Sequence, residues 1–225
     1  MYFVEVLHYM NLKKIIIRFR WYCKKWFPKV FFKPKMTINE VSLFHKILSP
    51  TSNILEFGSG GSTIVILTAQ KQLFSVESNI RFYNFMLSIK MLKKKIGTNF
   101  TYVFVDVGPT DMWGRPLSRI KFDTWGDYYV RIWDSIHQKN VQLDLIVVDG
   151  RFRVASTLYS IKQALNFNWD PKFLIHDFHR KEYHVLLQFL QIISHCESLF
   201  CFRVRKELNI VALERTLLEY RNISD

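Results

Sequence analysis

Hydrophobic and polar positions show two kinds of pattern along this chain of 225 residues, one typical of strands and one typical of helices. After Pro34, short apolar runs typical of buried strands alternate with longer stretches whose apolar residues recur every three or four positions, as in amphipathic helices. Strands that are apolar on both faces belong in a parallel sheet covered by helices on both sides. The predicted strands are 53–57, 72–76, 100–105, 143–148 and 172–176, and the predicted helices include 80–95, 154–165 and 182–195.

The last part of the chain breaks this alternation. Residues 199–205 and 208–213 are strand-like runs separated only by Lys206 and Glu207. A two-residue connection joins antiparallel strands, so the pattern predicts a C-terminal hairpin. At about 100 to 200 residues per domain, the length favours one domain. The predicted fold is α/β: a Rossmann-like, doubly wound sheet of seven mostly parallel strands that ends in an antiparallel hairpin.

Positive charge is concentrated at the N-terminus. Residues 1–36, here called the arm, hold nine Lys or Arg and one acid, Glu5, and so carry +8 of the net charge of +13. Residues 37–225 form the predicted domain and are only mildly basic. In the arm, apolar and aromatic residues fall near one helical stripe. Residues 12–35 can therefore bind an anionic membrane surface, pack on their own domain or, less favourably, bind nucleic acid; these alternatives stay open.

Composition narrows the class of protein. Hydrophobic residues at 49% and charged residues at 23% exclude wholesale disorder. The cysteines, Cys23, Cys196 and Cys201, are too widely spaced for a zinc site and are expected to be free thiols in a reducing cytosol. No run approaches the roughly 18 apolar residues of a membrane span, and the N-terminus lacks a signal-peptide pattern. We therefore expect a cytoplasmic protein, free or peripheral to the inner face of a membrane.

The segment from Ile54 to Thr63 carries the clearest chemistry, because a buried strand runs into a glycine-rich turn and then a helix. Such turns let backbone amides approach a ligand at the positive end of the helix. The turn lacks the Lys of a P-loop, and Thr63 replaces the third glycine of a dinucleotide fold. Acids end the first two strands, Glu56 and Glu77. They suit the ammonium and ribose of a ligand without phosphate, which matches S-adenosylmethionine.

Glu56, Gly58 and Gly60 form the order acid, any residue, glycine, any residue, glycine. On this motif, the chain from Asn53 to Leu213 resembles the class I S-adenosylmethionine-dependent methyltransferase family. The resemblance implies S-adenosyl-L-methionine as cofactor and an acid after the third strand near the adenine. The cofactor-binding residues it implies are Glu56, Gly58, Ser59, Gly60, Ser62, Thr63, Glu77, Asp106 and Asp149.

Polar residues also follow the fourth and fifth strands, where open α/β sheets bind their ligands. Methyl transfer to a hydroxyl needs a base to remove the proton, or a metal to lower the hydroxyl pKa. Some sugar and small-molecule methyltransferases of this family hold a divalent metal, which Asp149 and Asp177 would bind here. Phe178 stands where a second ligand is expected after the fifth strand, a departure from that pattern. The candidate catalytic residues are Asp149, His176, Asp177 and His179.

The long irregular stretch 108–129 and the arginines after the fourth strand are candidates for acceptor binding. Ring faces with nearby polar groups suit a sugar, and Arg can orient an acidic or polyhydroxylated acceptor. The residues are Trp113, Arg115, Tyr128, Arg151 and Arg153. This pattern resembles methyltransferase domains of glycan and surface-polysaccharide assembly, which implies O-methylation of a sugar or glycan hydroxyl. The alternatives are a nucleic-acid-binding protein or RNA methyltransferase with the same cofactor pocket, and a non-catalytic partner domain.

Overall fold

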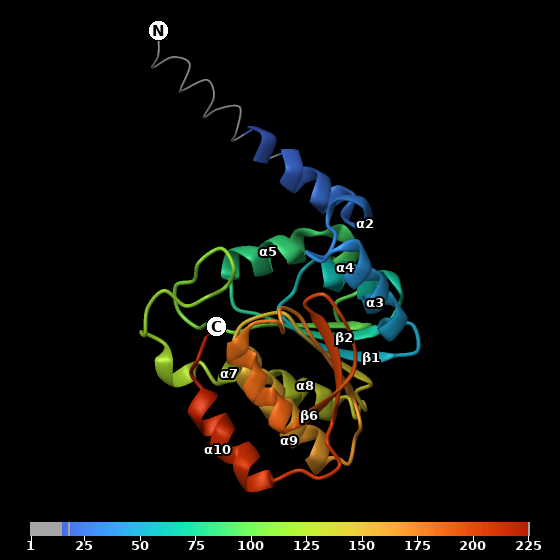
Figure 1. Cartoon of the computed structure of the whole chain (residues 1–225). Helices are drawn as coiled ribbons and strands as arrows, with labels where there is room; N and C mark the ends of the chain where they lie inside the picture. Colours follow the sequence, from blue (N-terminus) through green and yellow to red (C-terminus); the bar gives the residue numbers. More distant parts are fainter. Residues whose placement is uncertain (1–14, 18, 225) are drawn as a thin grey trace.

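The computed structural model describes residues 15–17 and 19–224, and Figure 1 shows a central sheet between two layers of helices. The seven strands run in the order β3-β2-β1-β4-β5-β7-β6. Strands β1 to β5 pair in parallel, whereas β7 is antiparallel to both β5 and β6. The predicted Rossmann-like, mostly parallel sheet is confirmed. The strands are β1 Asn53–Phe57, β2 Gln72–Glu77, β3 Phe100–Phe104, β4 Leu145–Val148, β5 Lys172–Ile175, β6 Leu190–Cys196 and β7 Leu199–Val204.

Each face of the sheet buries its own apolar cluster, and successive residues of β4 alternate between the two. One cluster, which includes Trp133 and Leu158, joins the sheet to α7, α8, α9 and α10; the other, which includes Phe44 and Leu67, joins it to α3, α4, α5 and α6. The helices are α2 Pro28–Phe31, α3 Ile38–Leu48, α4 Gly61–Thr68, α5 Ile80–Ser88, α6 Lys90–Lys93, η1 Phe122–Thr124, α7 Asp127–Val130, α8 Ile132–Gln138, α9 Arg153–Asn166, η2 Lys181–Gln188 and α10 Ile210–Tyr220.

The antiparallel hairpin lies earlier in the chain than predicted. The strand β7 matches the predicted run 199–205, but its partner is β6, which precedes it across a turn at Glu197 and Ser198. Residues 208–213 are not a strand. Instead, the Asn209 side chain accepts a hydrogen bond from the N–H of Ala212 at 3.0 Å and so caps the start of α10.

Two predicted helices differ for local reasons. The prediction of a helix over 182–195 is wrong: the 3₁₀ helix η2 ends at Gln188, and β6 follows. The β-branched pair Ile192 and Ile193 favours an extended backbone there. The predicted helix 80–95 is interrupted at Ile89, whose backbone is extended with ψ of 114° and whose side chain is fully buried.

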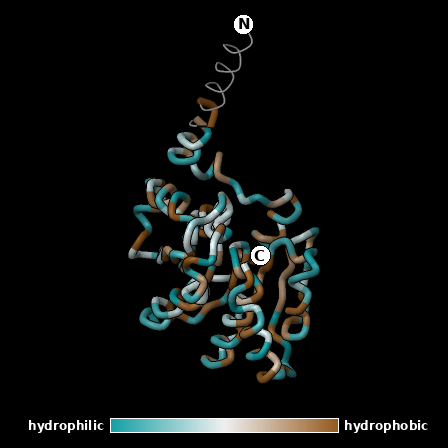
Figure 2. Tube along the Cα trace, turned by 90° about the vertical axis from the view of Figure 1, so that its left-hand side faces the viewer, coloured by the Kyte–Doolittle hydropathy of each residue, from teal (hydrophilic) through white to brown (hydrophobic). Residues whose placement is uncertain are grey.

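The described part of the arm is helical over residues 15–17 and 19–26 and extends away from the sheet (Figures 1 and 2). The Trp21 and Phe85 rings meet with centroids 4.1 Å apart, which ties the arm to α5. Leu12, Lys13, Lys14 and Arg18 lie outside the described residues, and the domain boundary at residue 36 stays a prediction. The large apolar side chains that the described part of the arm leaves exposed are Ile15, Ile16, Ile17, Phe19, Trp21, Tyr22, Trp26, Phe27, Val30 and Phe31.

Among the described helices, none combines the length and apolar character that crossing a bilayer requires. The three cysteines are free, as predicted.

Candidate functional site

Two glycine turns touch where β1 and β4 end. Gly58, with φ of +91°, follows β1, and Gly150 follows β4; a Cβ on either residue would overlap the backbone of the other. The N–H of Gly58 donates to the carbonyl of Val76 at 3.1 Å, and the N–H of Asp149 donates to the carbonyl of Phe57 at 3.0 Å. Because only glycine allows this contact, the two turns present backbone rather than side chains at this point.

The turns line a cavity of about 600 Å³, a volume typical of ligand pockets. The arm also lines this cavity, with Trp21, Lys24, Pro34 and Lys35, which the sequence analysis did not predict. The predicted residues that line it are Gly58, Ser59, Gly60, Ser62, Glu77, Trp113, Tyr128, Asp149, Arg151, Arg153, His176 and Asp177. Five other predicted site residues lie outside it: Glu56, Thr63, Asp106, Arg115 and His179.

Glu56 lies beneath the glycine turn instead of at its mouth. Its fully buried carboxylate accepts hydrogen bonds from the hydroxyls of Ser62 at 2.6 Å, Thr63 at 2.7 Å and Ser75 at 2.7 Å. Burial raises its pKa to about 7. The Thr63 hydroxyl also accepts from the N–H of Gly60 at 2.8 Å. Glu56 and Thr63 therefore join β1, β2 and the start of α4, and the expected contact of Glu56 with a ligand ammonium is not what this geometry provides.

Glu77 does line the cavity, and its carboxylate is held from three sides. It accepts from the N–H groups of Ser78 and Asn79 and from the Ser59 hydroxyl, each at 2.8 Å. Burial raises its pKa, against these hydrogen bonds. The Tyr102 hydroxyl lies 2.7 Å from that of Ser59 and so extends the network to β3. Tyr102 was not predicted as a site residue, because one Tyr in an apolar strand resembles a core residue.

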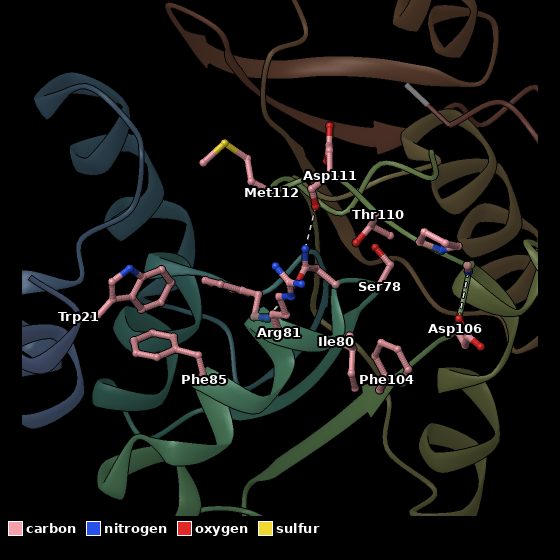
Figure 3. A pocket seen from close by; sticks show the side chains of 14 residues that line it. Trp21, Ser78, Ile80, Arg81, Phe85, Phe104, Asp106, Thr110, Asp111 and Met112 are labelled. Atoms are coloured by element: carbon pink, nitrogen blue, oxygen red, sulfur yellow. Dashed lines mark hydrogen bonds between the residues drawn. The ribbon is translucent and has the colours of Figure 1, made fainter. Parts of the chain in front are cut away.

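A second cavity of about 690 Å³ adjoins the first and shares Ser78 and Asn79 with it. Figure 3 shows Ile80 and Phe104 on one side of it and Asp111 and Met112 of the irregular stretch on another. Asp106 lies here; its carboxylate accepts from the N–H of Gly108 at 3.0 Å and is 3.7 Å from the Lys121 ammonium.

Asp149, His176 and Asp177 come together where β4 and β5 end. Their nearest donor atoms lie within 4.8 Å of one another. His176 Nδ1 lies 3.1 Å from Asp149 Oδ1 and 3.7 Å from Asp177 Oδ1. Three of the four predicted catalytic residues thus share one cluster. The fourth, His179, is exposed and does not line the cavity.

Arg153 binds both acids of this cluster, although the sequence analysis assigned it to the acceptor. Its guanidinium donates to Asp177 Oδ2 at 3.0 Å and to Asp149 Oδ1 at 3.2 Å. It also donates to the carbonyls of Gly150 and His176, at 3.1 and 2.7 Å. Only 3% of Arg153 is exposed. Arg153 therefore positions the turns after β4 and β5 and balances the charge of their carboxylates.

The electrostatics of the cluster follow from these pairs. Burial acts to raise the pKa of Asp149, but the hydrogen bond from His176 and the charge of Arg153 outweigh it, so the pKa is lowered. Burial acts to lower the pKa of His176, but the hydrogen bond and charge of Asp149, with the charges of Asp177 and Glu40, outweigh it, so that pKa is raised. The cluster therefore favours a carboxylate beside an imidazolium.

These residues do not fit a divalent metal as they are arranged. A metal needs a neutral imidazole and carboxylates free to coordinate it. Here the His176 pKa is raised, and Arg153 already bridges Asp149 and Asp177 with a positive charge. The predicted alternative of a metal held by Asp149 and Asp177 is thus disfavoured by Arg153, which supplies the cation.

Glu40 is a buried acid that sequence reasoning missed. It is the third residue of α3, and its carboxylate accepts from the N–H of Thr37 and of Ser198, each at 2.9 Å. Its Oε2 lies 3.6 Å from His176 Nε2. His176 is therefore flanked by a carboxylate at each ring nitrogen. The capping-box pattern of Thr37 and Glu40 was visible in the sequence, but the fold alone brings it beside β5.

The remaining residues predicted to bind the acceptor lie in different parts of the structure. Trp113 lines the cavity and is 54% exposed, with the Lys35 ammonium 3.6 Å from its ring centroid. The Tyr128 hydroxyl accepts from the N–H of Arg151 at 3.3 Å, so both stay close to the turn after β4. Arg115 is exposed and lies outside both cavities.

No protein-family profile matches the chain, and no curated protein matches it. Among solved structures, a methyltransferase-like protein from Silicibacter pomeroyi is 26% identical with a TM-score of 0.72, over 85% of this chain and 98% of that one. A Streptococcus pneumoniae protein, provisionally assigned as a tRNA (m1A22) methyltransferase and solved with S-adenosyl-L-methionine, is 10% identical with a TM-score of 0.43, over 80% of this chain and 78% of that one. The chain therefore shares its fold, over nearly the whole of that protein, with the methyltransferase-like protein from Silicibacter pomeroyi.

Proposed function

We propose that this protein is an S-adenosylmethionine-dependent methyltransferase that binds its cofactor in the cavity above Gly58 and Gly150. The observation that carries the proposal is that the glycine turn, Glu77 and Asp149 line one cavity. The turn offers backbone amides without a lysine, which suits a ligand without phosphate. The likeness to the methyltransferase-like protein from Silicibacter pomeroyi, which extends over nearly all of that chain, supports the proposal.

The geometry suggests which residues would hold each part of the cofactor. Residues 58–62 would bind the amino acid part, and Glu77 would accept hydrogen bonds from the ribose hydroxyls. The adenine would enter the second cavity, against the apolar side chains of Ile80 and Phe104 and near Asp106. Glu56 would act on the cofactor only indirectly, by fixing the turn through Ser62 and Thr63.

S-adenosylmethionine supplies a methyl group bound to a positively charged sulfur. The chain must place an acceptor hydroxyl in line with that methyl and remove its proton. We assign Asp149 as the base that removes this proton. Its Oδ1 is engaged by His176 and Arg153, whereas none of the described residues is bonded to its Oδ2. The charge on His176 weakens Asp149 as a base, so loss of the His176 proton should increase the rate.

The proposed acceptor is a hydroxyl of a sugar or glycan. The exposed Trp113 ring lines the same cavity as Asp149, and a ring face near polar groups suits sugar binding. The Tyr128 ring is buried against Phe57 and Phe152, so its role would be to support the turn after β4. Arg151 lies in the same cavity and would orient the acceptor's oxygens.

The arm would hold the enzyme at an anionic membrane surface, where a lipid-linked glycan would be available. Its exposed apolar residues, such as Phe19 and Trp26, alternate with exposed basic residues such as Lys25 and Lys29. An amphipathic surface of this kind binds the interface of anionic bilayers, with each basic group near the surface contributing about 1 kcal/mol.

Isothermal titration calorimetry with S-adenosylmethionine tests the cofactor site. We expect Glu77→Ala to weaken binding at least about tenfold, because a charge-assisted hydrogen bond is lost. Glu207→Ala, at an exposed acid far along the sequence from either cavity lining, is the matched control. Equal affinities of wild type and Glu77→Ala would remove the ribose assignment, and tighter binding of a dinucleotide would contradict the proposed cofactor class.

The same arm, with basic residues interleaved with rings, keeps RNA methylation as the second candidate. Binding to single-stranded RNA and to phosphatidylglycerol vesicles separates the two. RNA binding whose affinity falls steeply with salt would favour the nucleic-acid alternative. Vesicle binding without measurable RNA binding would favour the glycan proposal.

A further inference from the structure

The arm gives the cavity positive charge that the proposed methyl-transfer chemistry does not use. Lys24 and Lys35 line the cavity together with the glycine turn and Asp149. The backbone of Lys33 and Pro34 lies against Gly61 so closely that a Cβ on this glycine would overlap it. This contact fixes the end of the arm at the start of α4, beside the cavity.

Aromatic rings restrain both ammonium groups. Lys24 Nζ lies 5.0 Å from the ring centroid of Phe32 and 5.4 Å from that of Trp21. Lys35 Nζ lies 3.6 Å from the Trp113 ring, which joins the arm to the irregular stretch 108–129. Contacts of this kind hold a cation in place but do not neutralise it. Both side chains are therefore positioned and still charged.

Within the described residues, no carboxylate lies within 4.0 Å of the Lys24 or Lys35 nitrogen. Burial lowers the pKa of Lys24, and the nearby charges of Lys35 and Arg20 lower it further. The surroundings thus oppose the charge on Lys24, and an anion between the two ammonium groups would relieve that opposition.

The acids of the cavity cannot serve as that anion, because other groups already engage them. Glu77 accepts from two backbone N–H groups and from Ser59. Asp149 and Asp177 are both paired with Arg153. The positive charge at Lys24 and Lys35 is therefore available to a ligand.

We propose that Lys24 and Lys35 form a subsite for a phosphate group carried by the acceptor, which makes the acceptor a phosphorylated sugar or a sugar linked through a diphosphate. The inference rests on the proposed function and names its substrate class. It also divides the basic residues of the arm: Lys24 and Lys35 serve the cavity, whereas Lys25 and Lys29 are exposed, do not line it and are left for the membrane surface.

Inorganic pyrophosphate is the probe, titrated calorimetrically into the full chain. The variant carries Lys24→Met and Lys35→Met, which keep the apolar stems against the rings and remove both charges. The matched control carries Lys25→Met and Lys29→Met, which remove the same charge from the same arm. We expect the first variant to bind pyrophosphate at least about tenfold more weakly than wild type, and the control to change little. Lys24→Arg with Lys35→Arg should retain binding.

Vesicles of phosphatidylcholine with and without phosphatidylglycerol identify the source of the phosphate. We expect the control pair to reduce vesicle binding more than the Lys24 and Lys35 pair. If only the Lys24 and Lys35 pair abolished vesicle binding, the phosphate would belong to a lipid headgroup and the acceptor assignment would be overturned. Equal loss of pyrophosphate binding in both pairs would reduce the subsite to nonspecific charge and also overturn it.

S-adenosylmethionine affinity, measured on the same variants, separates this inference from the cofactor proposal. We expect the Lys24 and Lys35 pair to bind the cofactor as wild type does, which also shows that the variant is folded. Cofactor binding without pyrophosphate binding in the wild type would overturn the subsite alone. Pyrophosphate binding lost selectively in the Lys24 and Lys35 pair, without cofactor binding in the wild type, would support the subsite and contradict the proposed function.

Discussion

The ends of β1 and β4 each carry an acid, and their surroundings act in opposite directions. Among the described residues, Glu56 accepts only from neutral hydroxyls, so burial dominates and its pKa rises to about 7. Asp149 is paired with Arg153 and His176, and these partners lower its pKa against the effect of burial. The charge of the partners therefore decides which acid stays ionised. Glu56 is suited to holding a turn, and Asp149 to serving a cavity as a carboxylate.

Asp149→Asn should have the largest effect, because it removes the carboxylate that serves the cavity. If Asp149 removes the acceptor proton, the amide cannot replace it, and kcat should fall at least about 100-fold, the scale of general-base catalysis. The measurement is release of S-adenosylhomocysteine with a panel of sugar phosphates as acceptors. Asp170→Asn, at an exposed acid outside the cavity, should retain activity. A wild-type kcat in Asp149→Asn would show that another group removes the acceptor proton.

Glu56→Gln tests the raised pKa of Glu56 through the pH dependence of the free energy of unfolding. The folded pKa of about 7 exceeds the ordinary 4.5, so the folded state binds more protons between these values. The free energy of unfolding should then fall as pH rises through this interval. Glutamine removes the titration, so its stability relative to wild type should improve by up to about 3 kcal/mol across the interval. Urea unfolding at both ends of the interval measures this, with Glu207→Gln as control; parallel curves for Glu56→Gln and wild type would contradict the assignment.

Arg153→Gln tests whether the guanidinium charge determines the properties of the cluster around Asp149. Removing the guanidinium leaves Asp149 and Asp177 without their shared partner, and we expect a loss of about 2 kcal/mol, since both acids are partly exposed. The variant should also gain stabilisation by Mn²⁺, because the carboxylates become free to coordinate. In thermal unfolding, wild type should respond to neither Mn²⁺ nor a chelator. A melting temperature of wild type that depends on Mn²⁺ would show that Arg153 does not replace the metal.

Local sequence signals predicted the parallel half of the sheet and missed the order of its last elements. The apolar runs between Asn53 and Ile175 are short, apolar on both faces and separated by helical stretches, and this pattern indicates a buried parallel sheet. Near the C-terminus, the run 208–213 is apolar enough for a strand, and a single cap at Asn209 decides for a helix. The choice between β6 and a helix for residues 190–196 depends on pairing with β7, which no local pattern contains.

The candidate site divides in the same way. Residues adjacent to strand ends, such as Gly58, Glu77 and Asp149, reach the cavity because parallel strands end on one edge. Residues that precede the first strand, such as Lys24 and Glu40, reach the site through the packing of the arm and of α3, which only the fold specifies. Arg153 and Glu56 were assigned to ligands because sequence shows a charge but not the partner that already engages it.

Glu40→Gln is the mildest test of the comparison, because it changes Asp149 only through His176. The raised pKa of His176 means that its charge contributes stability below its ordinary pKa of 6.5, and that this contribution is lost as pH rises through the folded value. Removing the Glu40 charge lowers the His176 pKa, so stability should fall by about 1 kcal/mol more in acid than in alkali. A loss that does not depend on pH adds to this, because the amide oxygen can keep the Thr37 cap but the amide nitrogen cannot accept from Ser198. The acid limb of the pH profile of kcat should move to lower pH, because His176 then loses its proton earlier. Glu197→Gln removes an exposed charge from the β6–β7 turn and should leave the profile unchanged. An unchanged profile for Glu40→Gln, with the same loss of stability at every pH, would limit Glu40 to capping α3 and holding Ser198.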